Sequence, residues 1–265
     1  MKTYMRVMAL LLSLACLVLP AAAAGEAVAL RGIAEDSVPD ATGIGVAAVW
    51  NIENETFVYE HNIDALLAPA SLVKLMTAVC AYEVLGDRMD ETLTVEYSMI
   101  AAASGNQVGY YVGETISIRD LFGGLLTRGA NDCAYLLAYA ADGGTDAFVA
   151  RMNAKAASLG MDATVYKNPT GMNAEGAATT ARDSIRIAAV FNAIPALTAL
   201  SGSVQYEMPA TNKATARIIY NRNALVSRVS EIGYFDARIT EYLVSEFQRT
   251  ERVDLGGRRI IKKCP

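Results

Sequence analysis

Hydrophobic and polar residues change their spacing between residues 43 and 85, from the pattern of strands to that of a helix. Residues 43–50 and 55–60 are rich in β-branched and aromatic residues and predict two β-strands, joined by the polar turn at residues 51–54. The long apolar run that follows is interrupted by few polar residues and predicts a helix over residues 71–85.

The middle of the chain has the spacing of helices. One apolar run reaches Leu126, residues 133–141 form a second helical pattern, and residues 145–159 form a third that stops at Gly160. Thr180-Ala-Arg-Asp183 is typical of a helix start and predicts a helix through Asn192. A β-rich stretch begins at Val204. Strands, then helices, then strands indicate an α/β chain of the α+β type.

The first 24 residues have the pattern of a secretory signal peptide. Lys2 and Arg6 precede an apolar run over residues 7–19, and four alanines end at Ala24, where we expect cleavage. A retained anchor and a lipid-modified Cys16 are the alternatives, although the run is shorter than the roughly 20 residues that span a bilayer. The mature chain holds no second apolar stretch of that length. We therefore expect an exported protein with no transmembrane segment after cleavage.

Composition narrows the function. The 265 residues are 53% hydrophobic and 19% charged, which suits one sizeable globular core. The formal net charge of −5 becomes −7 once the cations Lys2 and Arg6 are removed. Nucleic acid is therefore an unsuitable partner.

The cysteines and the histidine do not favour a metal site or a histidine-based triad, either of which would have to be built on His61 alone. Cys80, Cys133 and Cys264 remain after cleavage without metal-ligand spacing, and the first two lie in apolar helical patterns that favour buried free thiols. His61 is the one histidine, and it ends a predicted strand near the surface. No metal or cofactor is expected, and lysine is left as the base for a nucleophile.

Ser71 and Lys74 carry the most specific chemistry in the chain. An i, i+3 spacing at a helix start puts hydroxyl and amine on one face, where a desolvated lysine can take the serine proton. The helix start adds backbone N–H groups suited to a developing oxyanion. About one Ser-x-x-Lys is expected by chance in a chain this long, so the surrounding residues decide its value. Pro69 and Ala70 precede the serine, and an apolar run would bury the rest of the helix.

Five segments, taken in order, give the chain a resemblance to the D-alanyl-D-alanine carboxypeptidases over about residues 38–240. These are serine penicillin-binding proteins (peptidase family S11) that trim peptidoglycan stem peptides. The segments are residues 69–78, residues 130–132, residues 168–171 with 179–183, residues 221–225 and residues 234–238.

The resemblance implies a fold and a mechanism. The fold would be the penicillin-binding-protein/β-lactamase-like transpeptidase fold, an antiparallel sheet flanked by a helical block. Ser71 would form the acyl-enzyme, Lys74 would deprotonate it, and Asn131 would hold the substrate amide and Lys74. The substrate would be a peptidoglycan stem peptide, and β-lactams would be covalent inhibitors.

The second catalytic element of the family is Ser-x-Asn, and this chain departs from that pattern. The family has serine at the position of Gly129, so the hydroxyl that would relay a proton to the leaving D-alanine is missing. Ser104-Gly-Asn106 matches the Ser-x-Asn pattern but lies too early in the chain. Ser104 is therefore interpreted as a loop serine. Thr127 is two residues out of register.

The third element, Lys-Thr-Gly on a strand, is expected directly after Thr240 and is not found there. Lys213-Ala-Thr215 lies too early and lacks the glycine. We therefore expect residues 25–240 to form an incomplete catalytic domain without its late strands, followed by an unmatched tail over residues 241–265 that a frameshift or truncation would explain. Activity is expected to be impaired.

Three alternatives remain open. A non-catalytic module that binds wall peptides or penicillin would need only Ser71, Lys74 and Asn131. A class A β-lactamase would need Ser-Asp-Asn and a glutamate-bearing loop, neither of which is found in position. An exported globular domain without a site is the third.

Overall fold

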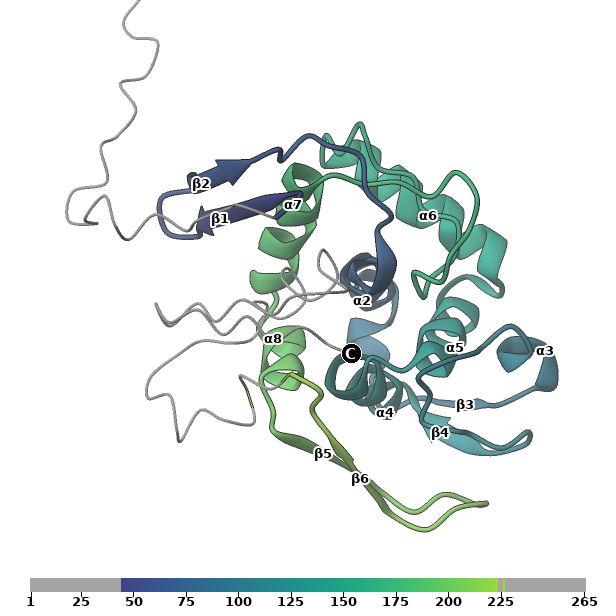
Figure 1. Ribbon diagram of the computed structural model, residues 1–265. Coiled ribbons are helices and arrows are strands. Elements are labelled where there is room, and N and C mark those ends of the chain that lie inside the picture. The colour runs from purple at the N-terminus through teal and green to yellow at the C-terminus, as the bar shows by residue number, and fades with distance from the viewer. Residues whose placement is uncertain (1–43, 224–225, 227–265) are drawn as a thin grey trace, which may run out of the picture. The chain divides into compact units, whose positions relative to one another are not determined.

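The computed structural model describes residues 44–223 and 226, and it begins with a β-hairpin (Figure 1). Strands β1 (Ala47–Asn51) and β2 (Thr56–His61) pair antiparallel with an irregularity between Val49 and Trp50. The Asn51 side chain closes the connecting turn by accepting hydrogen bonds from two backbone N–H groups. Both predicted strands and the polar turn are confirmed. The predicted signal peptide, residues 234–238 and the predicted tail lie outside the described residues.

Helix α2 (Val73–Leu85), preceded by the 3₁₀ turn η2 (Ala70–Leu72), is the central element of the helical block. Helices α5, α6 and α7 all pack against it (Figure 1). Every residue from Val73 to Ala81 is buried, Lys74 included, so α2 has no solvent-facing side in its first turns. This explains why the sequence shows a continuous apolar run here, and the predicted helix over residues 71–85 is confirmed.

The other helices follow in chain order. They are α3 (Tyr97–Ile100), α4 (Ile118–Gly123), the π-helical turn η4 (Gly124–Arg128), α5 (Asn131–Asp142), α6 (Thr145–Ser158), α7 (Ala181–Asn192) and α8 (Pro195–Ser201). Thr180 caps α7 as predicted, accepting from the Asp183 N–H at 3.1 Å. The short helices α3 and α8 were not predicted.

The described strands form three separate two-stranded antiparallel sheets. Besides the first hairpin, β3 (Thr92–Thr94) pairs with β4 (Thr115–Ser117), and β5 (Gln205–Met208) pairs with β6 (Arg217–Tyr220). The β5–β6 pair confirms the β-rich stretch from Val204. The α+β class is therefore correct, and β3 and β4 were missed because three-residue strands carry too little pattern.

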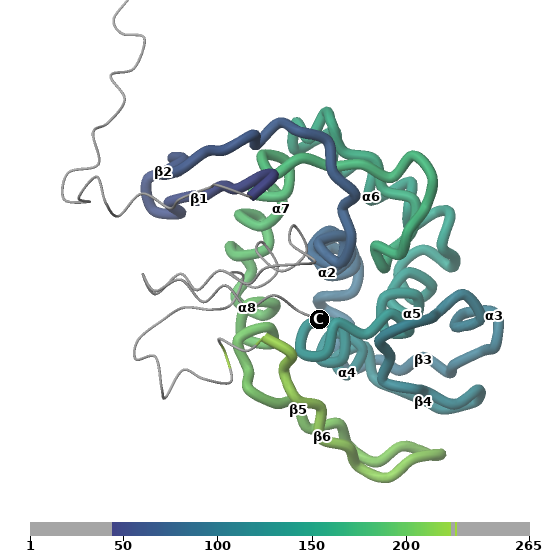
Figure 2. The backbone as a smooth tube through the Cα atoms, in the orientation of Figure 1, coloured from purple at the N-terminus to yellow at the C-terminus, as the bar shows by residue number. Residues whose placement is uncertain are grey.

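The β5–β6 hairpin lies below the β3–β4 pair in Figure 2. A buried ion pair ties this hairpin to the loop before β4. Glu114, with a fully buried side chain, pairs with Arg217 and also accepts hydrogen bonds from Thr211 Oγ1 at 2.8 Å and from the Tyr111 N–H at 2.9 Å. The Arg217 guanidinium lies 5.2 Å from the ring centroid of Tyr110. Since the carboxylate is satisfied on both oxygens, the pair fixes the hairpin in place.

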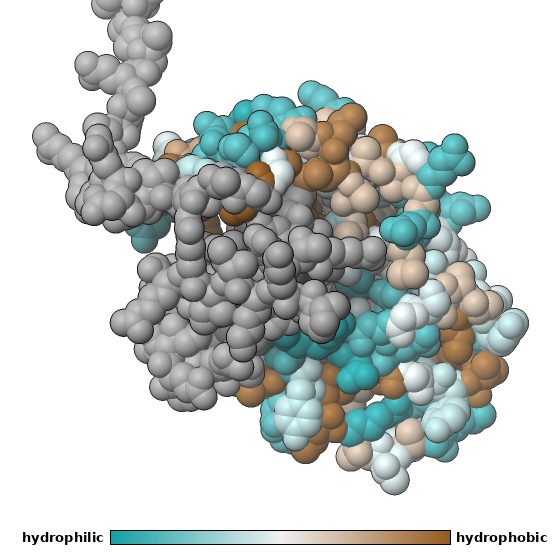
Figure 3. All heavy atoms as spheres, in the orientation of Figure 1, coloured by the Kyte–Doolittle hydropathy of each residue, from teal (hydrophilic) through white to brown (hydrophobic). Residues whose placement is uncertain are grey.

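On the described part of the face in Figure 3, hydrophilic and hydrophobic residues are interspersed. No single described helix has both the length and the hydropathy of a bilayer span. The helices α7 and α8 reach that length and composition only when taken together, and they meet at 104°.

Candidate active site

Ser71 and Lys74 lie side by side at the start of α2. Lys74 Nζ donates to Ser71 Oγ at 3.3 Å. Ser71 is half-buried, whereas Lys74 is only 2% exposed. The i, i+3 prediction for these two groups is therefore confirmed, and a buried amine faces a hydroxyl that solvent can reach.

A turn from a distant part of the chain also contacts Lys74. Lys74 Nζ also donates to the carbonyl oxygen of Thr170 at 2.7 Å, and Thr77 Oγ1, on the same helix, donates to the carbonyl of Pro169 at 2.7 Å. Two backbone carbonyls of the Asn-Pro-Thr-Gly segment are thus bound to side chains of α2. Sequence reasoning used this segment only for its resemblance and missed its contact with the lysine. The Asn-Pro-Thr-Gly composition is typical of a turn, and it was the one signal in the sequence that could have drawn attention to this segment.

The backbone just before Ser71 is held in an unusual conformation. Ala70 has a φ of +44°, a left-handed value that costs a non-glycine residue of the order of 1 kcal/mol. Gly171 has a φ of +79°, and a Cβ placed on it would lie 1.7 Å from the Ala70 carbonyl oxygen. Only glycine fits this approach, so the two segments pack backbone against backbone next to the serine.

Asn131 begins α5, which packs against α2, but it does not bond to Ser71 or Lys74. Its Nδ2 donates to the carbonyl of Ser104 at 2.6 Å and its N–H donates to the carbonyl of Asn106 at 2.7 Å. Its Oδ1 is buried without a hydrogen-bond partner among the described groups. The structure therefore brings Ser71 and Lys74 into contact and leaves Asn131 with one buried acceptor unused.

The Ser104 loop lies against the start of α5. Asp132 fixes this loop by accepting from the N–H groups of Val108 at 3.1 Å and Gly109 at 2.8 Å. Ser104 itself is exposed and outside any helix or strand, which confirms its interpretation as a loop serine. Its backbone, rather than its hydroxyl, contacts Asn131.

Gly129 ends the π-helical turn in a left-handed conformation, with a φ of +69°. The nearest atom to an added Cβ would be Asn106 Nδ2 at 3.6 Å, so a small side chain would have room. Thr127 is only 1% exposed. Its position two residues before Gly129 is the reason that it is not taken as a substitute for the missing serine. The position where the family has a serine hydroxyl therefore carries a bare backbone turn.

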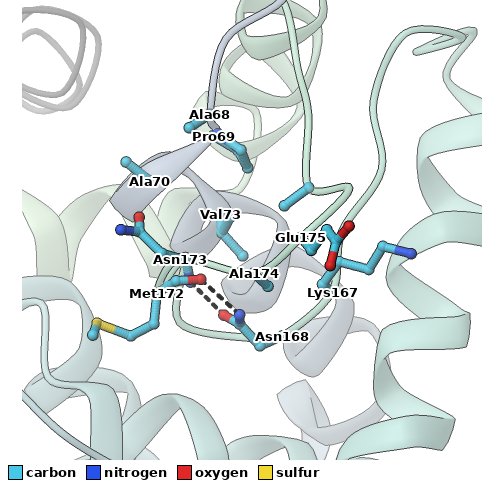
Figure 4. Close-up of a pocket in the computed structure, with 12 residues that line it drawn as sticks. Ala68, Pro69, Ala70, Val73, Lys167, Asn168, Met172, Asn173, Ala174 and Glu175 are labelled. Carbon is cyan, nitrogen blue, oxygen red and sulfur yellow. Dashed lines mark hydrogen bonds between the residues drawn. The ribbon is translucent and has the colours of Figure 1, made fainter.

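A cavity of about 310 Å³ opens beside Ala70, although neither Ser71 nor Lys74 lines it (Figure 4). Pro69, Ala70 and Val73 line one wall, and the Asn168 turn together with Met172 lines another. Figure 4 shows Asn168 beneath this turn, with dashed hydrogen bonds toward the Met172 segment. Across the turn, burial raises the pKa of the Tyr135 hydroxyl, against an opposite effect from Thr170.

The two described cysteines are buried and free, as predicted. Burial raises the pKa of the Cys80 thiol from 9.0 to about 12, and it also raises the pKa of the Cys133 thiol. These thiols are therefore inert packing groups rather than nucleophiles. His61 is partly exposed at the end of β2, where its Nε2 lies 3.2 Å from Asn62 Nδ2.

The fold and the serine–lysine pair define the class of penicillin-binding serine acyl-transferases. A crystal structure of a penicillin-binding protein homolog from Mycobacterium tuberculosis matches with a TM-score of 0.65 and 28% identity, over 72% of this chain and 70% of that one. The DD-transpeptidase of Streptomyces K15 matches with a TM-score of 0.65 at 23% identity, which supports the fold alone.

The chain belongs to the peptidase S11 family of D-alanyl-D-alanine carboxypeptidases, whose model matches residues 40–242. The carboxypeptidase DacF of Bacillus subtilis is 31% identical over 160 residues, which cover 58% of this chain and 41% of DacF. A D-alanyl-D-alanine endopeptidase of Escherichia coli is 31% identical over 207 residues, or 77% of this chain and 66% of that protein. The chain thus matches about two-fifths to two-thirds of the length of these relatives.

Proposed function

We propose that this chain is a serine-type D-Ala-D-Ala carboxypeptidase that removes the terminal D-alanine of peptidoglycan stem peptides through an acyl-enzyme on Ser71. The observation that carries the proposal is the buried Lys74 amine, 3.3 Å from Ser71 Oγ and 2.7 Å from the Thr170 carbonyl. A buried amine in contact with a half-exposed serine is the arrangement that activates a hydroxyl without histidine.

In the acylation step, Ser71 Oγ attacks the carbonyl carbon of the penultimate D-alanine while its proton passes to Lys74 Nζ. The Oγ–C bond forms, the C–N bond to the terminal D-alanine breaks, and the leaving amine takes up the proton that Lys74 Nζ received. Water then hydrolyses the ester, which returns the proton to Ser71 and releases the shortened peptide. Backbone N–H groups at the start of α2 would stabilise the oxyanion.

Asn131 is proposed to bind the substrate amide. Its Oδ1 is a buried acceptor without a described partner, and such an acceptor is stabilised when a substrate N–H or an ammonium donates to it. Asn131 is held at the N-terminus of α5 by two backbone carbonyls, so its amide is already oriented.

Gly129 is the reason that we expect a low rate of substrate turnover. Without a hydroxyl at this position, no side chain of residue 129 can pass a proton to the leaving D-alanine. Loss of one member of a catalytic unit costs orders of magnitude in rate, and such losses do not add simply. We therefore expect slow turnover, and a module that binds or is acylated by penicillin but scarcely turns over is the second candidate function.

The site of action is proposed to be the cell envelope, outside the cytoplasm. The signal-peptide pattern of the first 24 residues and the wall substrate named by the family support export. Expression of the full chain with an antibody tag, followed by fractionation and N-terminal sequencing, tests this. Cleavage after Ala24 is expected, and a cytoplasmic protein with an intact N-terminus would contradict it.

Labelling with a fluorescent penicillin tests the nucleophile. The purified chain is expected to form a covalent adduct on Ser71 that survives denaturation and that Ser71→Ala lacks. Ser203→Ala is the matched control, because Ser203 is an exposed serine after α8 whose hydroxyl bonds only the local Ala199 carbonyl at 2.8 Å. Folded protein without a Ser71 adduct would refute the proposal.

Two peptides then separate the activities. Release of D-alanine from diacetyl-Lys-D-Ala-D-Ala measures carboxypeptidase activity, and cleavage of a cross-linked stem-peptide dimer measures the endopeptidase activity that the E. coli relative's name gives. We expect slow, Ser71-dependent D-alanine release. An adduct with penicillin but no cleavage of either peptide would favour the binding module.

A further inference from the structure

The side chain of Asn168 makes four hydrogen bonds within a single turn. Its Oδ1 accepts from the Thr170 N–H at 3.1 Å, from Thr170 Oγ1 at 2.8 Å and from the Gly171 N–H at 2.8 Å. Its Nδ2 donates to the Met172 carbonyl at 2.8 Å. One amide thus fixes the course of three consecutive residues (Figure 4).

This turn presents a carbonyl to the catalytic amine. Asn168 binds the N–H and the hydroxyl of Thr170 and the N–H of Gly171. The Thr170 carbonyl is therefore held in place, directed at Lys74 Nζ, 2.7 Å away. The turn has a second anchor, the bond from Thr77 Oγ1 to the Pro169 carbonyl at 2.7 Å. No atom of Asn168 needs to touch the substrate for it to affect the reaction.

We propose that Asn168 is a positioning residue for Lys74, holding the Thr170 carbonyl where it orients the amine toward Ser71. The inference rests on the proposed function of Ser71 and Lys74 and assigns a residue that this function does not include. A lysine amine on its flexible four-carbon stem can place its lone pair in many orientations. A fixed acceptor opposite the serine restricts them to the one that can take the hydroxyl proton.

The chain offers a matched control in Asn153. Its Nδ2 donates to the carbonyls of Val149 at 3.0 Å and Tyr166 at 2.9 Å, and its Oδ1 accepts from the Tyr166 N–H at 2.8 Å. Asn153 therefore holds the same loop by two bonds to Tyr166, two residues before the turn, and has a third bond within α6. Asn153→Ala loses three structural bonds and Asn168→Ala loses four, but only Asn168→Ala releases the Thr170 carbonyl.

Stopped-flow acylation by a fluorescent penicillin, with its binding and acylation constants separated, is the first measurement. Asn168→Ala is expected to lower the acylation constant about tenfold to hundredfold with little change in the binding constant. Asn168→Asp, which keeps the three acceptor bonds, is expected to recover most of the rate, and Asn153→Ala should remain within about threefold of the parent. Equal losses in Asn168→Ala and Asn153→Ala would overturn the proposal.

Reductive methylation of the unliganded protein, followed by peptide mass spectrometry, gives a readout that needs no activity. Lys74 methylation, relative to that of Lys155 on α6, is expected to become several-fold faster in Asn168→Ala and to stay unchanged in Asn153→Ala. An unchanged Lys74 in Asn168→Ala would overturn the proposal even if the parent acylates well. Conversely, a parent without acylation but with the expected methylation pattern would refute the function and retain the positioning.

Stability must be compared as well, because Asn168→Ala removes bonds from a turn. If its melting temperature falls far below that of Asn153→Ala, Thr77→Val replaces it, since this change frees the Pro169 carbonyl from a different side. Thr77→Val is expected to slow acylation and expose Lys74 to a smaller extent. A folded Thr77→Val with parental values in both measurements would count against the proposal.

Discussion

Lys74 Nζ and the carbonyl oxygen of Thr170 are joined by a 2.7 Å hydrogen bond across 96 positions of the sequence. This bond is shorter than the 3.3 Å between the same amine and Ser71 Oγ, its neighbour on the helix. The amine is thus fixed more closely by the distant turn than by its partner in the motif. We therefore expect chemistry at Ser71 to depend on a loop that the Ser-x-x-Lys motif does not contain.

Gly171→Ala is expected to abolish penicillin labelling. A Cβ at Gly171 would lie 1.7 Å from the Ala70 carbonyl oxygen, and backbone must move to relieve that overlap. The displaced segments are the ones on either side of Ser71 and Thr170. Labelling per folded molecule, with folding followed by circular dichroism, measures the effect.

Gly176→Ala is the control for the Gly171 substitution. Gly176 has a similar φ of +74°, but its added Cβ would meet only the end of the Lys167 side chain at 3.4 Å. It should lose about 1 kcal/mol of stability and keep its labelling. Loss of labelling in both variants would show that backbone strain, and not the Ala70 contact, is responsible.

Gly129→Ser restores a hydroxyl at the second element, and we expect it to rescue little. The left-handed φ of +69° costs a serine about 1 kcal/mol, and residues 241–250, where the resemblance places Lys-Thr-Gly, do not contain this motif. Gly129→Ala has the same strain without the hydroxyl. D-alanine release by Gly129→Ser should exceed that of Gly129→Ala by less than about tenfold. A hundredfold gain would show that the missing hydroxyl alone limits turnover.

Glu114→Gln is expected to destabilise the fold by about 3 kcal/mol, because it leaves the Arg217 guanidinium beside a neutral partner in a buried position. Urea unfolding measures the loss. The control is Glu91→Gln, which breaks the exposed pair of Glu91 with Arg88, and its unfolding midpoint should be unchanged. Equal midpoints for both variants would contradict the role of the buried pair in fixing the β5–β6 hairpin.

Cys80 and Cys133 are expected to resist iodoacetamide at pH 8 in the folded protein. With the Cys80 pKa raised to about 12, about one thiol in ten thousand is ionised at this pH, and burial hinders the reagent further. Both should react on unfolding in urea, as mass spectrometry of labelled peptides would report. Fast alkylation of either cysteine in native protein would contradict their burial.

The same shift predicts how stability depends on pH. The Cys80 thiol ionises near pH 9.0 when unfolded and near pH 12 when folded, so its buried neutral form contributes full stability below pH 9. Above pH 9 the unfolded chain loses its proton first, and the free energy of unfolding falls until about pH 12. Cys80→Ser should flatten this decline in urea titrations at alkaline pH.

Local features of this chain could be predicted from its sequence, and its long-range contacts could not. The Ser71–Lys74 contact follows from helical spacing, and the β1–β2 hairpin from alternation and turn residues, because each is set within a few residues. The bond from Lys74 to Thr170 depends on how α2 packs against a loop almost a hundred residues later. No local pattern of residues specifies such a contact.

Asn131 illustrates the same limit. It directly precedes the helical pattern predicted over residues 133–141, and in the structure it begins the corresponding helix α5. Its hydrogen-bond partners are the backbone carbonyls of Ser104 and Asn106. In the sequence, these two residues indicated only a Ser-x-Asn match at the wrong place in the chain. Backbone acceptors have no sequence signature, since every residue carries one.

The close approach of Gly171 to the Ala70 carbonyl has a consequence for how the protein can be assayed. This approach joins two segments about a hundred positions apart in the sequence, so we expect a molecule in which they are separated not to present its serine correctly. Titration of Ser71 with a radiolabelled β-lactam would then measure the fraction of molecules that are native. Such a count would report on refolding and on inactivation by heat as directly as any spectroscopic signal.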